Sequence, residues 1–392
     1  MQVDALIIGA GPAGTSCALG LAMRGCRVVI IDKSVFPRNK TCGGFIGPES
    51  MAMMIDFEIW PRLLKEGACV VEESVLTSSR GASTAIPIEG IALGVSRKLL
   101  DKLLLDSAKV MGVEVYEGAQ VRNIYNNSTG FDVTVDHYLV NKVFNLRACH
   151  VIDASGQHAP SSNLGRVQLG LAAMYENIPQ ASGRVMLHCC QGGHVGINSF
   201  ENNQVNVCYV VDSEYFKTKG NNAQKVITDW IKESSHLQRV LIGAKRVSEW
   251  KAIYIPVRNS IVLYENGIWR VGNSAAFIDT AIGVGISVAL QSGQLLAQSI
   301  TGYSHDVERL KFYTLEYQRC FSGQRRLASL FGNLIHYPWA AEMIIRLLDA
   351  NYTMRRKVMN YSRPGFEVEG RMDYTKSQFF NMGVKKGVFS EV

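Results

Sequence analysis

The sequence predicts an α/β fold with two or three structural units, and three observations lead to this prediction. A strand pattern, a glycine-rich turn and an apolar helix pattern follow one another at the beginning of the chain, which is typical of a parallel α/β unit. Strand-like segments dominate residues 169–211, and the last part of the chain has helical periodicity. A chain of 392 residues is long enough for more than one sizeable core.

The first unit begins with a short apolar strand pattern over residues 4–8. This strand runs into the sequence G-x-G-x-x-G over residues 9–14. A helix pattern over 15–25 and a strand pattern that ends in an acid over 26–32 complete the arrangement. Strand, glycine turn, helix, strand and acid in this order predict a Rossmann-type unit that binds a dinucleotide.

Each conspicuous residue of this motif has a physical reason. Gly9 permits the tight turn, Gly11 lets the backbone approach a pyrophosphate, and Gly14 lets the helix and strand pack closely. The helix N-terminus presents amides to the phosphates. Asp32 is placed to accept hydrogen bonds from a ribose hydroxyl. The alternative is a glycine turn that only joins strand to helix.

A second segment bears on which dinucleotide binds. Residues 271–279 close a strand, and after them residues 283–286 open a long apolar helix. A second helix N-terminus would then face the cofactor. Its free amides at Gly285 and Ile286 could stabilise negative charge on a reduced isoalloxazine ring, which favours FAD over NAD.

This segment resembles a known family pattern, G-D-A-A-x-x-x-D-P-x-x-G-x-G-I. It belongs to the FAD-dependent oxidoreductases that include aromatic hydroxylases, flavin halogenases and geranylgeranyl reductases. Residues 36–44, 95–104 and 151–156 also resemble the family, in the family's order. Together with the first motif, the resemblance spans residue 4 to about residue 300.

The resemblance implies which residues bind the cofactor. Asp32 would hold the adenosine ribose, Arg97 would approach the phosphates or the ribityl chain, and Asp153 would support a turn near the cofactor. Asn273 stands where the family usually has Asp, and Thr280-Ala281 replaces a frequent Pro. The full set of predicted cofactor-binding residues is Gly9, Gly11, Pro12, Ala13, Gly14, Asp32, Lys33, Arg38, Cys42, Gly43, Arg97, Asp153, Gly272, Asn273, Asp279, Gly283, Gly285 and Ile286.

Several of these residues also have purely structural interpretations. Cys42 is the predicted catalytic residue, because Lys40 to Gly44 resembles the K-x-C-G-G of geranylgeranyl reductases, yet it could be a small packing residue. Arg97 could lie on the surface at a helix start. The nearby Asp101 could be an ordinary exposed helix acid.

The predicted domain organisation is discontinuous. Residues 1–75, 96–165 and 265–305 form the FAD-binding domain, with a helix over 97–112 and a strand meander over 113–152. Residues 76–95 and 166–264 form a mainly antiparallel sheet domain that binds substrate, with a helix near 222–234. Residues 306–392 form a helical region.

An apolar stripe in this last region has several possible roles. Ile335, Trp339, Met343 and Leu347 fall at i, i+4 steps. We expect the stripe to pack in the core or to cap the substrate pocket. A dimer face and a membrane surface are the alternatives, so peripheral membrane contact stays open.

Composition and charge exclude other classes. Charged residues make up 19% of the chain and hydrophobic residues 47%, which indicates a folded globular protein. The net charge of +7 is spread along the chain and predicts no nucleic-acid partner. No leader sequence and no apolar run long enough for a membrane span is visible. The nine cysteines lack the spacing of a disulfide framework, which predicts a cytoplasmic protein.

The sequence predicts no metal site. His188, Cys189, Cys190 and His194 have metal-binding side chains, but strand neighbours point to opposite faces and the spacing matches no zinc site.

The predicted activity is a FAD-dependent oxidoreduction driven by NADH or NADPH. We favour a monooxygenase that hydroxylates an apolar or aromatic small molecule, of the kind found in specialised metabolism. The alternative is a carbon–carbon double-bond reductase resembling geranylgeranyl reductases. A halogenase is disfavoured because Trp250–Pro256 does not match W-x-W-x-I-P. A flavin-binding scaffold without turnover is disfavoured too, and the oligomeric state is not predicted.

Overall fold

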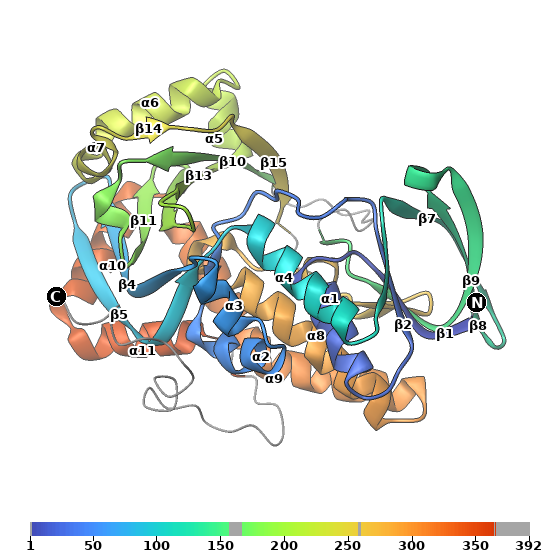
Figure 1. Cartoon of the computed structure of the whole chain (residues 1–392). Helices are drawn as coiled ribbons and strands as arrows, with labels where there is room; N and C mark the ends of the chain where they lie inside the picture. Colours follow the sequence, from blue (N-terminus) through green and yellow to red (C-terminus); the bar gives the residue numbers. More distant parts are fainter. Residues whose placement is uncertain (1, 157–166, 258–259, 364, 366–392) are drawn as a thin grey trace.

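The computed structural model describes residues 2–156, 167–257, 260–363 and 365. It contains two β-sheets side by side, with helices packed against both (Figure 1). The predicted α/β class is confirmed, and so is the C-terminal helical region as far as residue 362, while residues 366–392 of that predicted region lie outside the described residues.

The first sheet is built around parallel strands. β1 pairs in parallel with β2 on one side and with β9 on the other, and β17 and β6 extend this parallel core. The strands in spatial order are β16 (Tyr264–Glu265), β17 (Ile268–Arg270), β9 (Lys142–Asp153), β1 (Gln2–Ile8), β2 (Val28–Asp32) and β6 (Glu114–Glu117), and β7 (Ala119–Asn127) and β8 (Gly130–His137) continue from β9.

Both faces of this sheet are covered, as expected for parallel strands. Ala5, Ile7 and Ile30 pack against helices α1 (Pro12–Ala22), α4 (Arg97–Val110) and α8 (Gly285–Gly302). Leu6 and Ile31 point to the other face, where the β7–β8 hairpin covers them. The alternation along β1 and β2 therefore sets which side receives the helices.

The second sheet is mainly antiparallel. Its exception is the parallel pair of β4 with β11. The strands in spatial order are β14 (Lys245–Arg246), β10 (Val167–Glu176), β13 (Val205–Asp212), β12 (Gly193–Ser199), β11 (Arg184–Cys190), β4 (Cys69–Ser78), β5 (Ser83–Gly94) and β3 (Phe45–Ile46), and β15 (Lys251–Pro256) also pairs with β10.

The predicted domain boundary at residue 75 is wrong. β3 and most of β4 lie within residues 1–75, yet both belong to the second sheet. β4 pairs with β5 along its length, and only the second half of that hairpin was assigned to the sheet domain. Strand pairing ties the hairpin together, so a boundary inside β4 is not possible.

The two faces of the second sheet have different neighbours. Along β13, Val207 and Tyr209 point toward helix α6 (Ala223–Glu233), where they meet Trp230. Cys208 and Val210 point the other way, toward a cavity between the sheets. The period of two in a strand thus divides β13 into a core face and a cavity face.

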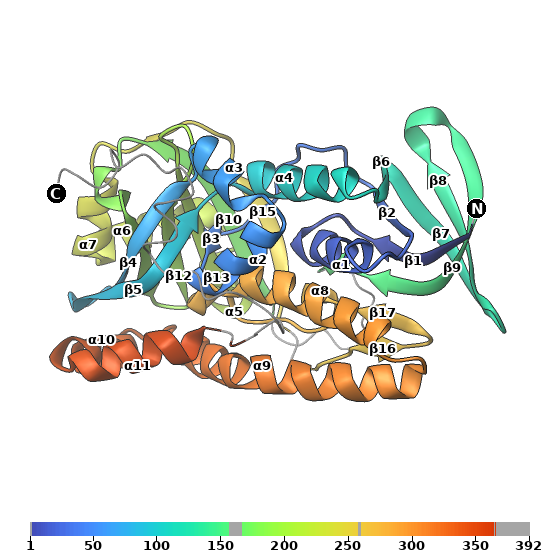
Figure 2. The same ribbon diagram turned by 60° about the horizontal axis from the view of Figure 1, so that its bottom comes forward.

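The C-terminal helices α9 (Asp306–Leu334), α10 (Pro338–Ala350) and α11 (Tyr352–Ser362) form a layer that runs beneath both sheets (Figure 2). Among the described residues, none of the helices combines the length and the apolar character that crossing a bilayer requires. The shorter α-helices are α2 (Met51–Asp56), α3 (Trp60–Lys65), α5 (Ser213–Thr218) and α7 (Ser235–Leu241).

The predicted packing of the apolar stripe is wrong for three of its four residues. Ile335 is buried, but Trp339, Met343 and Leu347 are each more than half exposed, at 54%, 64% and 54%. The buried face of α10 is formed by Ala341, Ile345 and Leu348 instead. Ile335 precedes α10, and steps of four residues drift around a helix with 3.6 residues per turn, so the stripe turns away from the core.

Candidate active site

A cavity of about 380 Å³ lies between the two sheets. Residues from the glycine turn, α4, both strands of the β12–β13 pair and the C-terminal helices contribute to its walls. The predicted cofactor residues that line it are Gly11, Pro12, Ala13, Arg38, Cys42, Gly43, Arg97, Asn273, Gly283, Gly285 and Ile286. The predicted residues that do not line it are Gly9, Gly14, Asp32, Lys33, Asp153, Gly272 and Asp279.

The glycine turn admits no side chain at two positions. Gly9 has φ of +108°, and a Cβ there would lie 2.6 Å from the carbonyl oxygen of Ala154. A Cβ on Gly14 would lie 2.0 Å from the carbonyl oxygen of Gly9. At Gly11 the nearest atom would be the Arg97 Nη2, at 3.6 Å. Gly9 and Gly14 therefore shape the turn, while Gly11 faces the open cavity beside a guanidinium.

Asp32 lies at the end of β2 and is buried. Its Oδ2 accepts a hydrogen bond from the Ala10 amide at 2.7 Å, and its Oδ1 accepts one from the Ser34 amide at 2.7 Å. Each oxygen keeps a second lone pair for a hydroxyl donor. Asp32 thus fastens the glycine turn to β2, whereas the side chain of the adjacent Lys33 is exposed.

A cluster of positive charge forms the wall beside the glycine turn. Arg97, the first residue of α4, donates two hydrogen bonds to the Asp101 carboxylate, at 2.6 and 2.7 Å. Arg38 Nη1 lies 3.1 Å from the same carboxylate. Asp101 is completely buried, so its interpretation as an ordinary exposed helix acid is wrong. Its carboxylate holds both guanidinium groups at the cavity.

The charges of this cluster do not balance. Arg38, Lys40 and Arg97 carry three positive charges, and Asp101 carries one negative charge. Burial lowers the pKa of the Lys40 ammonium, and repulsion by Arg97, Arg38 and Lys33 lowers it further. Burial also acts to lower the pKa of Arg97, but the charge and hydrogen bonds of Asp101 more than offset this and raise it. An anionic group such as a pyrophosphate fits this cluster.

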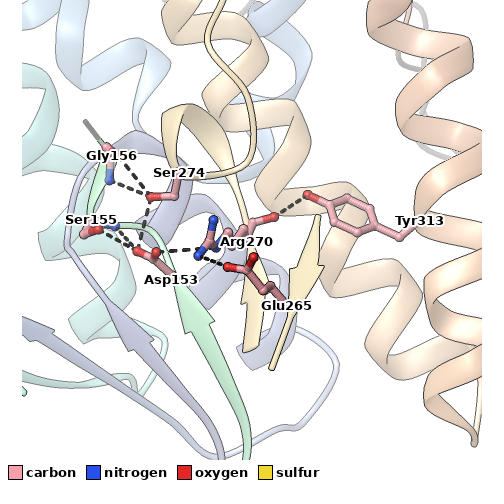
Figure 3. Close-up of polar contacts among 7 residues, drawn as sticks. All are labelled: Asp153, Ser155, Gly156, Glu265, Arg270, Ser274 and Tyr313. Carbon is pink, nitrogen blue, oxygen red and sulfur yellow. Dashed lines mark hydrogen bonds and ion pairs between the residues drawn. The ribbon is translucent and has the colours of Figure 1, made fainter. Parts of the chain in front are cut away.

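A second network supports the turn at the end of β9 (Figure 3). Asp153 Oδ1 accepts hydrogen bonds from the Ser155 amide at 2.9 Å and from the Ser274 hydroxyl at 3.2 Å. The Gly156 amide donates to Ser274 Oγ at 2.7 Å, and Arg270 lies 3.9 Å from Asp153. This network fixes the loops after β9 and β17 beside one another. Sequence reasoning identified Asp153 but not Ser274 or Arg270.

The loop before α8 forms another part of the cavity wall. Asp279 Oδ1 accepts a hydrogen bond from the Ala281 amide at 3.0 Å, so its side chain holds the loop rather than lining the cavity. Gly272 and Ala13 are in close approach, because a Cβ on Gly272 would lie 2.7 Å from Ala13 Cβ. The N-cap residue of α8, Val284, makes no side-chain cap, and the first helical residues Gly285 and Ile286 line the cavity.

Cys42 lies in a loop that the second sheet holds in place. Asn206 of β13 donates a hydrogen bond to the Cys42 carbonyl at 3.1 Å, and Asn198 of β12 donates to the carbonyls of Gly43 and Gly44 at 3.2 Å each. The Cys42 Sγ accepts a hydrogen bond from the Gly44 amide at 3.5 Å, and its proximity contributes to the raised pKa of the Arg97 guanidinium. Cys42 therefore lines the cavity near a fixed positive charge.

The opposite wall of the cavity is formed by apolar side chains of the second sheet. Ile253 and Ile255 of β15, Leu187 of β11 and Val210 of β13 line it. The sequence analysis considered Trp250–Pro256 only as a poor match to the halogenase motif W-x-W-x-I-P. The i, i+2 spacing of the two isoleucines is the sequence signal that predicts a shared apolar face on this strand.

His194 also lines this wall and was missed as a cavity residue. Burial, together with the nearby His336, lowers its pKa to about 3. Burial lowers the pKa of His188 to about 3 as well, and its Nδ1 lies 2.6 Å from the Thr77 hydroxyl. Within the described residues, no group of three or more His, Cys, Asp or Glu side chains is arranged to hold a metal ion.

Known proteins similar to this chain include flavin-dependent halogenases as well as reductases. Tryptophan 2-halogenase of Chondromyces crocatus is 22% identical over 344 residues, which cover 81% of this chain and 65% of the relative. Residues 2–252 match the family described as FAD binding domain. Menaquinone reductase of Mycolicibacterium smegmatis is 25% identical over 362 residues, which cover 84% of each chain. Digeranylgeranylglycerophospholipid reductase 2 of Methanosphaera stadtmanae is 25% identical over 337 residues, which cover 80% of this chain and 82% of the relative.

Solved structures support the same fold. The flavin-dependent brominase Bmp2 superposes with a TM-score of 0.80 over 95% of this chain and 96% of its own. The two sequences are 19% identical, so the likeness concerns the fold.

Proposed function

The chain belongs to the FAD binding domain family and is a FAD-dependent oxidoreductase, and on this premise we propose that it reduces a carbon–carbon double bond of an apolar substrate. We infer NADH or NADPH as the electron donor. The observation that carries the proposal is Cys42, which lines the cavity together with Arg97 and with the apolar side chains of the second sheet.

The residues around the glycine turn have the chemistry that FAD requires. Gly11 leaves room at the cavity, and the unbalanced positive charge of Arg38, Lys40 and Arg97 suits two phosphates. Asp32 keeps lone pairs for the ribose hydroxyls. The uncapped N-terminus of α8 offers amides to a carbonyl of the ring system. When bound, FAD supplies the hydride for the reduction.

Reduction of a double bond also needs a proton for the second carbon. We assign this proton to the Cys42 thiol: its S–H bond breaks, a C–H bond forms on the substrate, and the electrons of the S–H bond stay on sulfur as a thiolate. Arg97 lines the cavity near the sulfur, and solvent returns the proton after the product leaves. The apolar side chains Ile253, Ile255 and Val210 would keep water away from the reacting carbons.

The names of two relatives support a reductase. The menaquinone reductase and the digeranylgeranylglycerophospholipid reductase each match this chain over at least four-fifths of both lengths. We therefore propose an isoprenoid-like substrate for this chain.

Hydroxylation is the second candidate, and it was our first expectation from the sequence. The apolar wall of the second sheet fits this reaction as well as reduction, because oxygen activation by a reduced flavin requires a site that excludes water. The proton donor and the oxygen requirement separate the two reactions.

The test uses the FAD-loaded full chain, NADPH and a menaquinone with a short isoprenoid chain, with and without oxygen. Two added hydrogens that persist in the isoprenoid chain after the product is reoxidised to the quinone support double-bond reduction, provided they are gained without oxygen, whereas a product that contains oxygen from O2 supports hydroxylation. We expect Cys42→Ala to lower the rate of the reduction about a hundredfold while the flavin is still reduced by NADPH. Cys149→Ser, at an exposed cysteine, is the control. An unchanged rate in Cys42→Ala would remove the thiol from the reaction.

A further inference from the structure

We propose that Arg363 is a specificity-determining residue that binds a neutral carbonyl oxygen of the substrate. The inference rests on the proposed function of the cavity, and it names the class of molecule that the cavity accepts. That class is an elongated apolar molecule with one ketone, quinone or ester carbonyl.

Arg363 reaches the cavity from the C-terminal helices. It follows α11 directly and lines the cavity together with Met359 and Ser362. Its guanidinium lies over the ring of Phe45, 5.0 Å from the ring centre. Phe45 follows the Cys42 loop and contacts the loop before α8, because its Cδ1 lies 3.5 Å from the place of a Cβ on Gly283. Arg363 therefore lies at the part of the cavity where the Cys42 loop and the α8 N-terminus meet.

The backbone of Arg363 is held against helix α9. Its carbonyl oxygen accepts a hydrogen bond from Gln324 Nε2 of α9 at 2.9 Å. Its side chain is only 15% exposed, so the guanidinium is largely shielded from bulk water. An arginine in such a place requires acceptors for its five N–H donors, because an unpaired buried donor is costly.

The partners that Arg363 has are weak. Nη2 donates to the Met359 thioether at 3.2 Å, and a thioether is a weak acceptor. Nη1 lies 3.8 Å from a carboxylate oxygen of Glu49, which is beyond hydrogen-bond distance. Within the part of the chain that the structure describes, Nη1 has no hydrogen-bond partner. The guanidinium thus offers unused donors at the cavity.

Glu49 decides what kind of acceptor fits. Its carboxylate is buried, and Glu49 is not among the residues that line the cavity. It balances the charge of Arg363 from behind without saturating its donors. A ligand carboxylate would bring a second buried negative charge close to Glu49, whereas a neutral carbonyl supplies only the missing acceptor atom.

The rest of this part of the cavity suits a hydrocarbon body. Leu327 and Phe331 of α9, Leu348 of α10 and Val358 of α11 line it. One polar anchor in an apolar cavity is the usual way in which a protein orients such a ligand.

Binding of three matched probes tests the proposal: farnesylacetone, a ketone; farnesene, a hydrocarbon; and farnesoic acid, a carboxylate. Affinities are measured by titration calorimetry with the FAD-loaded full chain. We expect the wild type to bind the ketone about tenfold more tightly than the hydrocarbon, as one hydrogen bond to a charged donor predicts. Arg363→Met should lose this preference and Arg363→Lys should keep part of it. Arg356→Met is the control, since Arg356 pairs with Glu89 at the surface.

A second variant tests the role assigned to Glu49. Glu49→Gln removes the balancing charge, so it should raise the affinity for farnesoic acid and leave that for farnesylacetone within about threefold. The proposal is overturned if the wild type shows no preference for the ketone, if Arg363→Met keeps it, or if the wild type prefers the acid. Binding is measured without turnover, so these outcomes are independent of whether the reduction itself is observed.

Discussion

The two walls of the cavity are built by different means. The wall beside the glycine turn is formed by backbone and by charges that share one buried carboxylate, Asp101. The wall on the second sheet is formed by apolar side chains such as Ile253 and Ile255, which stand on the cavity face by strand alternation. Few other residues can replace those of the first wall, whereas residues of the second wall can be exchanged for other apolar residues while the strands keep their shape. Under the proposed function, cofactor binding and substrate choice would depend on walls with different tolerance to substitution.

The sharpest test of the first wall is Gly14→Ala. The added Cβ would lie 2.0 Å from the carbonyl oxygen of Gly9, and neither backbone segment can move without opening the turn. We expect a loss of stability of more than about 4 kcal/mol, or no folded protein, in chemical denaturation. Gly302→Ala is the matched control, because a Cβ there meets nothing within 4 Å. Similar stability of the two variants would contradict the tight packing of this turn.

The second test removes the shared charge of the first wall. Asp101→Asn leaves Arg38 and Arg97 buried without their counter-charge, and we expect a loss of about 3 kcal/mol of stability together with weaker FAD binding. Flavin occupancy and chemical denaturation measure the two effects. Asp106→Asn, on the same helix, is the control because its pair with Lys102 is partly exposed. Equal effects of the two variants would show that Asp101 has no special role.

The third test uses pH to address the second sheet. His188 and His194 have folded pKa values of about 3, below the ordinary value of 6.5. Below pH 6.5 the unfolded chain binds protons that the folded chain does not, so stability falls as the pH falls from 6.5 toward 3. At pH 5 each histidine should lower the free energy of unfolding by about 2 kcal/mol relative to neutral pH.

The variants His188→Gln and His194→Gln identify the source of this pH dependence. Each should flatten the loss between pH 7.5 and pH 5 in denaturant titrations. A pH profile that is the same in the wild type and in both variants would assign the loss to other groups.

The mildest test concerns the apolar wall. Ile255→Val removes one methylene group from a buried residue that already borders open space, so we expect a cost of about 1 kcal/mol. FAD occupancy should stay unchanged, while affinity for an apolar probe such as farnesylacetone should change. A loss of bound flavin in this variant would mean that the two walls are not separable.

Much of the wall beside the glycine turn could be predicted from the sequence. The glycine turn and Asp32 lie within a contiguous segment whose conformation is decided locally, and the predicted Arg38, Cys42, Arg97 and Asn273 all line the cavity. Parallel strands, helix starts and glycine positions have local signatures, because backbone geometry restricts which residues can occupy them.

The remaining features depend on segments that are far apart in the chain. The membership of β4 in the second sheet depends on its pairing with β11, more than a hundred residues later. The exposed stripe of α10 depends on which face meets β4 and β5. Arg363 reaches the Cys42 loop only through the layer of C-terminal helices. The sequence by itself determined the fold class and the cofactor motif, because these follow from local backbone preferences. Only the tertiary structure decided the apolar wall, the buried Asp101 and the anchor at Arg363, because burial and charge pairing are properties of contacts between distant segments.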